Sequence, residues 1–455
     1  MGPMDYLKQN EKQSLEQLKE MLRIPSVSAQ SQHKDDVRRC AHWLADYMKS
    51  VGIKSEVCET GGHPLVYGEY HVSDNVPTVL IYGHYDVQPV DPLNLWKTAP
   101  FDPIEEGEYL IGRGSSDDKG QIFCHIKSAE AYLKTVGKIP VNLKYMIEGE
   151  EESSTNNLGK FIQNNTAKFK SHIVVVSDGA QYGVDLPAIN YGLRGIAFVE
   201  IKVSGPDRDL HSGSFGGTVA NPIHALAKMI GRLHFENGQV AIDGFYNNVY
   251  TPSRWEKDQM AKLPFDQKAF LASTGAPKLW GEKGYAPLEQ TWSRPTLDCN
   301  GITGGYQGEG GKTIIPSWAS TKITMRLVPN MNPDDICDKI ESYLKKICPD
   351  TVRLEVIKHG GANPVMVPTD GPWLEAAARA IKTGFGKDPY FTKEGGSIPV
   401  VESFKTVLGI DTLLLGLGQQ TDNTHSPNER FLIKDFHRGC RTSVALLEEM
   451  TKIKV

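Results

Sequence analysis

The spacing of apolar residues along the chain predicts alternating helices and strands. Apolar positions at helical spacing run through residues 7–23 and 36–51, and a helix breaker follows each run, Pro25 after the first and Gly52 after the second. Further helices are predicted at residues 119–136 and 156–165, and β-rich runs predict strands at 53–57, 65–70, 78–82, 141–147 and 173–176. This alternation predicts an α/β layer with a largely parallel or mixed sheet, whose ligand site lies beyond the C-terminal strand ends.

The pattern changes after Tyr191. Strands are predicted at residues 196–203, 319–327 and 352–357 and helices at 220–233 and 333–346, with a long irregular stretch to about residue 312. The α/β pattern returns with helices at 373–383 and 434–450 around a strand at 412–415. We therefore expect a two-domain α/β protein, in which a discontinuous α/β domain (1–191 and 366–455) is interrupted by an inserted α+β domain (192–365).

Composition narrows the possible partners and the compartment. Acidic residues outnumber basic ones by 55 to 50, so no global positive field points to nucleic acid or anionic lipid. No stretch approaches the ~20 apolar residues of a membrane span, and the first residues lack the charged and apolar segments of a secretion signal. The seven cysteines are scattered without a CxxC pair. We expect a cytoplasmic protein in which nitrogen and oxygen atoms hold any metal.

Acidic residues and histidines gather in five places in the α/β portion. Four clusters come just after predicted strands and the fifth shortly after the strand at 412–415: His84 with Asp86, Asp117 with Asp118, Glu148 to Glu152, Asp178, and His425. The strand ends of an open α/β sheet converge on one crevice, so these groups can meet in space. So many acids would repel one another strongly unless a cation lay among them.

Each cluster also has a simpler explanation. A lone histidine after a strand is usually a loop or core residue, Asp117 and Asp118 could cap the following helix, and residues 150–152 could form a solvated loop. Asp178 before a glycine is an ordinary turn signal. The argument for a metal site therefore rests on the five clusters together.

The chemistry of these clusters fits two divalent metals. Metals ~3.5–4 Å apart need a bridging carboxylate and terminal histidine and acidic ligands, with a shared water as the nucleophile. Because His84 and Asp86 are two residues apart, extended backbone places both on one face, where Asp86 can accept the free imidazole N–H and orient His84. Adjacent Glu151 and Glu152 point in different directions, so one can bind metal while the other acts as general base.

Several segments together resemble a known enzyme family. GRGSSDDKG, DLHSG followed by FGG, KTIIP, RLVPNM, HGG and EGGSIPV are similar to the co-catalytic zinc metallopeptidases, which include glutamate carboxypeptidases, succinyl-diaminopimelate desuccinylases, aminoacylases and dipeptidases. Within that family they most resemble the cytosolic non-specific, carnosine dipeptidase-like branch. The resemblance covers nearly the whole chain. It implies a phosphorylase/hydrolase-like α/β catalytic domain with an inserted α+β lid or dimerisation domain.

The resemblance also implies a metal site. One ion is expected on His84 and Asp178 and the other on Glu152 and His425, with Asp117 bridging and the bond between Asp117 and Asp118 in the cis form. Both ions are expected to be zinc, with manganese or cobalt as alternatives. Glu151 matches the general base and Asp86 the acid behind His84. An additional acid at Glu150 leaves a one-position slip between base and ligand open.

Several residues, most of them in the inserted domain, match the family's substrate-binding positions. The resemblance implies that His211 reaches the active site of the partner subunit and polarises the scissile carbonyl, which would make the enzyme a homodimer. It also implies that Thr313, Arg326, His359 and Ser397 bind the substrate's terminal carboxylate and backbone, with Gly396 allowing close approach. Without the resemblance, His211 is better explained as a loop histidine, and Arg326 could equally form a surface ion pair.

Three functions remain open from the sequence. We expect a di-zinc metallopeptidase that cleaves the peptide bond of dipeptides with a free C-terminal carboxylate, using a metal-bridging water activated by a Glu general base. The alternative is a deacylase that uses the same metal core on N-acyl or N-succinyl amino acids. The third, a catalytically silent metal-binding protein, is disfavoured because base, ligands and orienting acid are all present. The irregular stretch at residues 235–312 contains no motif that identifies the preferred side chains.

Overall fold

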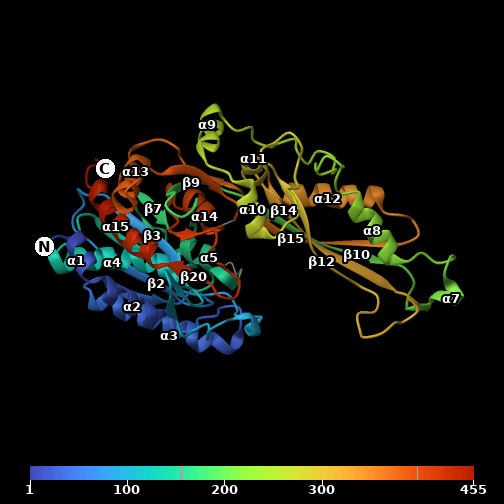
Figure 1. Ribbon diagram of the computed structural model, residues 1–455, viewed down its shortest axis with the longest axis horizontal. Helices are drawn as coiled ribbons and strands as arrows, with labels where there is room; N and C mark the ends of the chain where they lie inside the picture. Colours follow the sequence, from blue (N-terminus) through green and yellow to red (C-terminus); the bar gives the residue numbers. More distant parts are fainter. Residues whose placement is uncertain (154–156, 397) are drawn as a thin grey trace. The chain divides into compact units, whose positions relative to one another are not determined.

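The computed structural model of the protein, a mixed α/β structure, describes residues 1–153, 157–396 and 398–455 (Figure 1). It divides into a first unit, Met1–Tyr191, Val367–Thr392 and Val400–Val455, and a second unit, Gly192–Met366 and Lys393–Pro399. This division differs from the expected domains at Met366 and in the segment Lys393–Pro399, because both group with the second unit. None of the helices in the described part of the chain is both long and apolar enough to span a bilayer.

A mixed sheet forms the centre of the first unit. Its strands follow the order β1-β2-β6-β3-β7-β18-β9, with β3 parallel to β6 and β7, and β18 parallel to β7. β1 and β2 add antiparallel pairs at one side. The strands are β1 (Lys54–Cys58), β2 (Leu65–Tyr70), β3 (Thr78–His84), β6 (Asn142–Glu148), β7 (Ile173–Val176), β9 (Ala188–Leu193) and β18 (Thr412–Leu414). β7 is buried throughout, as a continuous β-branched run in a covered parallel sheet should be.

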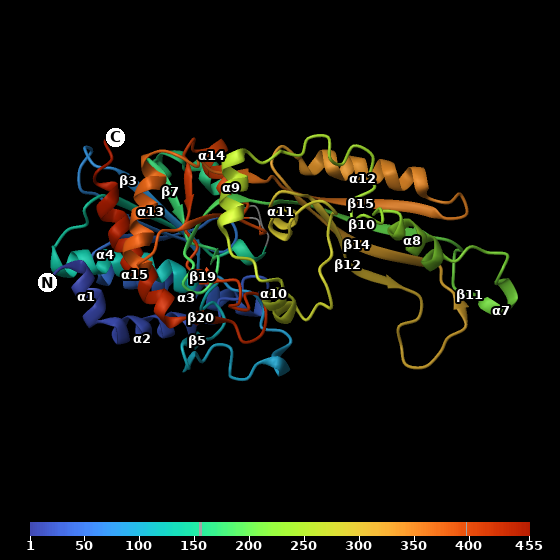
Figure 2. The ribbon, with the colours of Figure 1, turned by 45° about the horizontal axis from the view of Figure 1, so that its top comes forward.

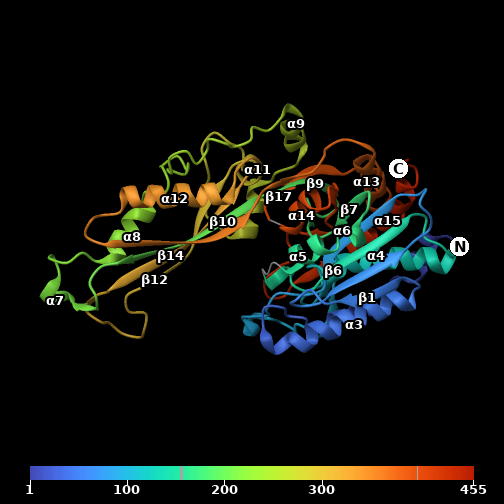
Figure 3. The same cartoon turned by 180° about the vertical axis from the view of Figure 1, so that it is seen from behind.

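Helices cover both faces of this sheet (Figure 1 and Figure 3). Val79 and Ile81 of β3 share a core with the helices α1 (Pro3–Gln9), α2 (Glu11–Leu22), α3 (Lys34–Ser50), α4 (Lys119–Thr135), α13 (Pro372–Phe385) and α15 (Ile433–Met450). On the other face, Tyr82 packs edge-on against Phe404 of α14 (Val400–Thr406), with ring centroids 5.4 Å apart. α5 (Asn157–Asn164) contacts α14, and α6 (Thr166–Phe169) follows it. Alternate residues of one strand thus support two helical layers.

The predicted helix over residues 7–23 is wrong in one respect, because it is interrupted at Asn10. This residue has φ −111° and ψ 19°, outside the helical region, and separates α1 from α2. Its side-chain amide donates to the carbonyl of Tyr6 at 2.8 Å, as does its backbone N–H at 3.0 Å. Such local bonding of asparagine competes with helix propagation, which apolar periodicity does not detect.

The second unit contains a four-stranded antiparallel sheet in the order β12-β14-β10-β15 (Figure 2). The strands are β10 (Gly195–Ser204), β12 (Thr296–Gly304), β14 (Trp318–Leu327) and β15 (Arg353–Ala362). Alternate residues of β10 are buried against α8 (Pro222–Gly231) and α12 (Pro333–Ile347), which both cover one face. The intervening residues lie on the opposite face, which these two helices leave uncovered.

The stretch predicted to be irregular contains α9 (Arg254–Lys262), α10 (Gln267–Thr274), α11 (Pro287–Trp292) and the strand β12. β12 escaped prediction because it is polar, largely exposed and interrupted by a register shift between Cys299 and Gly301. It becomes a strand by pairing with β14. The helices are short, although the capping box of Ser253 and Glu256 marks the start of α9.

Short elements complete the two units. β4 (Ile104–Glu106), β5 (Tyr109–Ile111) and β20 (Arg430–Leu432) form a small sheet, and β8 (Ala180–Gln181) pairs with β19 (Gly418–Gln419). In the second unit β11 (Leu210–His211) pairs with β13 (Ile314–Ile315), β16 (Val365–Met366) pairs with the end of β9, and α7 (Ser212–Phe215) follows β11. β17 (Tyr390–Glu394) also pairs with β9, and 3₁₀ turns occur at Ser31–His33, Leu93–Leu95 and Glu151–Ser153.

Candidate metal centre

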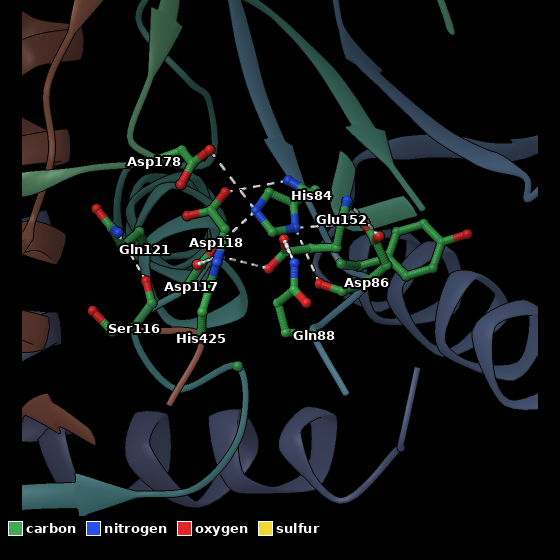
Figure 4. A network of polar contacts seen from close by, with 12 residues as sticks. His84, Asp86, Gln88, Ser116, Asp117, Asp118, Gln121, Glu152, Asp178 and His425 are labelled. Atoms are coloured by element: carbon green, nitrogen blue, oxygen red, sulfur yellow. Dashed lines mark hydrogen bonds and ion pairs between the residues drawn. The ribbon is translucent and has the colours of Figure 1, made fainter. Parts of the chain in front are cut away.

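Neighbouring strands of the first unit deliver the candidate ligands to one end of the sheet (Figure 4). His84 is the last residue of β3, Glu152 lies in the turn after β6, and Asp178 follows β7. His425 comes from the segment after β18 and β19. Since β6, β3, β7 and β18 are adjacent and parallel, their carboxyl ends open on the same side.

Two groups of potential ligand atoms share Asp117. One group contains His84, Asp117 and Asp178, the other Asp117, Glu152 and His425, and in each the atoms lie within 4.8 Å of one another. Asp117 Oδ1 lies 3.0 Å from His84 Nε2, and Asp117 Oδ2 lies 3.0 Å from His425 Nε2. The two oxygens of one carboxylate therefore face different histidines, as a bridging ligand requires.

The outer acids complete each group. Asp178 Oδ2 lies 3.8 Å from His84 Nε2, and Glu152 Oε1 lies 3.3 Å from His425 Nε2. The structure thus brings together all five residues for which the sequence suggested metal binding: His84, Asp117, Glu152, Asp178 and His425.

The donor set fits a pair of divalent cations. His84 Nε2 is buried and has no well-aligned hydrogen bond among the described residues, although carboxylates surround it. A buried polar nitrogen without such a bond is costly, and a metal ion would satisfy it. Burial raises the pKa of Asp178 to about 7, with nearby Asp117 and Glu152 adding to the effect and His84 opposing it. Imidazole nitrogen with carboxylate oxygen suits zinc, manganese or cobalt.

The peptide bond between Asp117 and Asp118 is cis, as the resemblance implied. Asp118 is the N-cap residue of α4 but makes no side-chain capping hydrogen bond. Its Oδ2 instead accepts a hydrogen bond from the backbone N–H of His84 at 3.2 Å. Burial raises the pKa of Asp118 well above its ordinary value, with Asp178 as the next contribution.

Asp86 contacts His84 differently from the prediction. His84 Nδ1 lies 3.0 Å from the backbone carbonyl oxygen of Asp86 and 3.5 Å from the carboxylate oxygen Oδ1. The other carboxylate oxygen accepts from Ser28 Oγ at 2.5 Å and from the backbone N–H of Glu152 at 3.0 Å. The carboxylate is turned toward these two donors, so the carbonyl takes the imidazole N–H. The expected carboxylate–imidazole hydrogen bond is therefore corrected to a carbonyl–imidazole one.

The three consecutive acids after β6 point to different partners. Both carboxylate oxygens of Glu150 face Asn157 Nδ2, at 3.1 and 3.2 Å. Glu152 Oε2 accepts from Gln88 Nε2 at 2.5 Å, while its other oxygen faces His425. The carboxylate of Glu151 makes no hydrogen bond or ion pair with the described residues. Burial raises the pKa of Glu151 well above its usual range, with His84 opposing and Asp178 adding to the shift.

Sequence reasoning missed Ser28, Gln88 and Glu429, which hold parts of this centre in place. Ser28 and Gln88 are common loop residue types with no local signal. Glu429 lies in the same TDNTHSPNER segment as His425, so its proximity to a candidate ligand was a usable signal.

His211 and Thr313 of the second unit are exposed and lie at the small β11–β13 pair. His211 Nδ1 accepts from the backbone N–H groups of Gly213 at 3.1 Å and Ser214 at 3.3 Å. The carbonyl of Thr313 accepts from the N–H of Ser212 at 3.1 Å. Within its own unit His211 therefore caps the single turn α7.

Arg326 and His359 lie on strands that flank β10 on either side. His359 stacks on Phe198, with ring centroids 4.5 Å apart, and Arg326 pairs across the sheet with Ile196. Burial lowers the pKa of Arg326, with Asp298 opposing.

A glycine segment follows β17 in the second unit. Arg194 binds it twice, because its N–H donates to the carbonyl of Gly396 at 3.1 Å and its Nε to that of Gly395 at 3.3 Å. Ser397, the other predicted substrate contact here, lies outside the described residues.

Several known proteins resemble this chain in sequence and in fold. The chain is 33% identical to the Cys-Gly metallodipeptidase DUG1 of Candida albicans, over 96% of this chain and 94% of that protein. The crystal structure of human carnosine dipeptidase 1 matches with a TM-score of 0.89 and 28% identity, covering 99% of this chain and 98% of that one. The M20 metallo-carboxypeptidase Sso-CP2 of Sulfolobus solfataricus matches with a TM-score of 0.87 and 32% identity, covering 97% and 99%.

The model of a peptidase family matches residues 80–449, most of the chain. That range contains every residue of the two ligand groups described above. The resemblance inferred from the motifs is thereby confirmed, and the chain belongs to peptidase family M20/M25/M40.

Proposed function

We propose that this protein is a metal-dependent dipeptidase that acts on dipeptides with a free C-terminal carboxylate. The observation that carries the proposal is the position of Asp117 between two histidine–carboxylate groups. The names of the relatives support the substrate class, since one is a Cys-Gly metallodipeptidase and another a carnosine dipeptidase.

In this proposal His84 and Asp178 hold one divalent ion, Glu152 and His425 hold the second, and Asp117 contacts both. When bound, such ions lower the pKa of a water molecule and polarise the scissile carbonyl. Asp86 positions two of these ligands. Its backbone carbonyl accepts from His84 Nδ1, and its carboxylate accepts from the backbone N–H of Glu152. Gln88 orients the Glu152 carboxylate by donating to Oε2, the oxygen that does not face His425.

Glu151 is the proposed general base. Its carboxylate makes no hydrogen bond with the described residues and lies beside the ligand Glu152, which leaves it available to take a proton. It removes a proton from the attacking water, whose oxygen adds to the peptide carbon. The same proton then passes to the amide nitrogen as the C–N bond breaks, which releases two free amino acids. The contacts of Glu150 with Asn157 and of Glu152 with Gln88 favour this order over a one-position slip.

The second unit supplies the proposed carboxylate recognition. Burial lowers the pKa of Arg194 to about 10, and the charge of neighbouring Arg326 adds to the shift. An anionic carboxylate would offset this repulsion between guanidinium groups. We assign Arg326 to the substrate carboxylate, and Thr313, His359, Gly396 and Ser397 to the rest of the substrate backbone.

The proposal extends to the assembly. The first unit is the catalytic domain, and the second is the lid and dimerisation domain. His211 acts on the carbonyl in the partner's active site, which makes the enzyme a homodimer. Zinc is the proposed ion, and the seven free cysteines favour a cytoplasmic location.

A second activity, removal of the C-terminal residue from longer peptides, is favoured by the similarity to the Sulfolobus metallo-carboxypeptidase. One experiment separates the candidates. Metal-stripped protein is reloaded with zinc, manganese or cobalt and assayed on Cys-Gly, β-Ala-His, a tripeptide and N-acetylated amino acids. Turnover of the dipeptides alone supports the proposal, and faster release from the tripeptide favours the carboxypeptidase. Turnover of acylated amino acids without dipeptide cleavage would contradict the dipeptidase proposal and favour a deacylase.

A further inference from the structure

The turn that carries His425 has an unfavourable backbone conformation. His425 itself has φ 61°, and Asn423 and Asn428 have φ 58° and 62°. This left-handed region is sparsely populated by residues other than glycine, although asparagine tolerates it. Backbone of this kind persists only where surrounding contacts hold it in place.

Glu429 makes an unusually complete set of such contacts. Its carboxylate is fully buried and accepts four hydrogen bonds from one loop. Oε2 accepts from Arg113 Nη1 at 2.7 Å and from the N–H of Gly114 at 2.9 Å. Oε1 accepts from the N–H groups of Ser116 and Asp117, each at 3.0 Å. The last of these donors belongs to the residue shared by both ligand groups.

Asp422 holds the same turn on the N-terminal side of His425. Its Oδ2 accepts from Ser116 Oγ and from the N–H of Gln419, each at 2.7 Å. Its carbonyl accepts from the N–H of Arg430 at 2.9 Å, which closes the turn across His425. Anchors on both sides of His425 therefore attach to the loop that presents Asp117.

We propose that Glu429 is a positioning residue that fixes the spacing between Asp117 and His425, and through it the affinity for the metal ion these two residues share. The inference rests on the proposed function. Glu429 contacts neither histidine directly and acts through the backbone of Asp117 and the turn that carries His425. Arg113 gives the carboxylate a charged partner and donates its Nη2 to the carbonyl of Pro89 at 3.0 Å.

A neutral amide at this position tests the idea. In Glu429→Gln one acceptor oxygen becomes an NH₂ group, which would face N–H donors and displace the loop. The matched control is Glu130→Gln, which removes another buried carboxylate that accepts from Tyr6, Tyr47 and Lys127 without touching this loop. Both variants are expected to lower the thermal midpoint, so stability alone does not separate a positioning role from a structural one.

The deciding readouts are metal affinity, by zinc competition against a chromophoric chelator, and the visible spectrum of the cobalt-loaded protein. We expect Glu429→Gln to weaken one of two zinc sites by ~10–100-fold, the range for residues that orient metal ligands, and to alter the cobalt spectrum. Glu130→Gln should match wild type in both. Wild-type affinity and spectrum in folded Glu429→Gln would overturn the inference, as would equal changes in both variants.

Failure of the proposed function has a different signature, because zinc-loaded wild-type protein would then cleave none of the dipeptides, whereas the affinity and spectrum above report metal binding alone. If Glu429→Gln does not fold, Glu429→Asp replaces it. This variant keeps the charge beside Arg113 but shortens the reach toward the N–H groups of Ser116 and Asp117. The same weakened zinc site is expected, and unchanged affinity would overturn the inference.

Discussion

Asp117 and His425 come from distant parts of the sequence, yet Oδ2 of the one lies 3.0 Å from Nε2 of the other. The second oxygen of Asp117 lies at the same distance from His84. One carboxylate thus connects two ligand groups, which makes it the residue whose loss should affect both ions.

Replacing the shared acid should differ from replacing a terminal one. We expect Asp117→Ala to lose both metals and all measurable activity, and Asp178→Ala to lose mainly the ion held with His84. Elemental analysis of the purified proteins measures the stoichiometry. Asp207→Asn, an exposed acid paired with Arg208, is the control and should retain two ions. Equal losses in the Asp117 and Asp178 variants would contradict the bridging role.

Variants of the three consecutive acids Glu150, Glu151 and Glu152 should differ in metal content and turnover. Glu151→Gln should keep both metals and lose turnover by about 10²–10⁴-fold, the usual contribution of a general base. Glu152→Gln should lose metal, because this side chain lies 3.3 Å from His425. Glu150→Gln should retain metal and most activity, since its carboxylate faces Asn157. Metal loss in the Glu151 variant with full occupancy in the Glu152 variant would shift the assignment by one residue.

Subunit mixing tests whether His211 acts across a dimer. His211→Ala should leave fold and metal content intact and still reduce turnover, because the side chain is exposed and caps only one short helical turn. Mixing it with Glu151→Gln should restore part of the activity, since one site of each hybrid dimer then has both residues. Absence of recovery despite subunit exchange verified by mass spectrometry would exclude action in trans.

Stability should depend on pH through the buried residue His125. This histidine lies between Ser177 Oγ at 2.8 Å and Ser443 Oγ at 2.9 Å, and burial lowers its pKa from 6.5 to about 4. Between these values the unfolded chain binds a proton that the folded protein does not, so this contribution to stability is lost as the pH falls. One pKa unit corresponds to ~1.4 kcal/mol, which predicts a loss of about 3 kcal/mol from near neutral pH to pH ~4.

Urea unfolding of metal-free protein at several pH values measures this effect. His125→Gln should be less stable at neutral pH. Below pH ~6.5 its unfolding free energy should fall less steeply with pH than that of wild type, by about 3 kcal/mol in total. His224→Gln, at an exposed position, should keep the wild-type slope. An identical slope in the His125 variant would show that its protonation does not contribute.

Removal of metal should destabilise the first unit as well as abolish activity. A ligand that binds only the folded state raises the unfolding free energy in proportion to the logarithm of its concentration over its dissociation constant. Adding EDTA should therefore lower the thermal midpoint in calorimetry, and excess zinc should restore it. In Asp117→Ala, EDTA should have no further effect.

Prediction from the sequence succeeded where local pattern and final environment agree. The run Ile173–Val176 is apolar and β-branched and becomes a buried strand, and Pro333–Ile347 has helical periodicity and covers a sheet with its apolar side. It failed where local pattern was weak. Thr296–Gly304 is polar and exposed, and only its pairing with β14 makes it a strand.

The site divides in the same way. His84, Asp117, Glu152, Asp178 and His425 were recognisable because each is a metal-binding residue type near a predicted strand or within a family motif. The orientation of their side chains could not be recognised from the sequence. The carboxylate of Asp86 accepts from Ser28 and the backbone of Glu152, while its carbonyl faces His84. Gln88 contacts Glu152 although no neighbouring residue in the sequence indicates such a role.

By itself, the sequence determined the residue types, the order of strands and helices that carry them, and the family to which the chain belongs, because these depend on local chemistry and spacing. Only the tertiary structure decided which oxygen faces which nitrogen. Those contacts join segments far apart in the chain, such as Asp117 with Glu429, and depend on how the strands stack and how the loops beyond them close. Spacing along the chain does not contain that information.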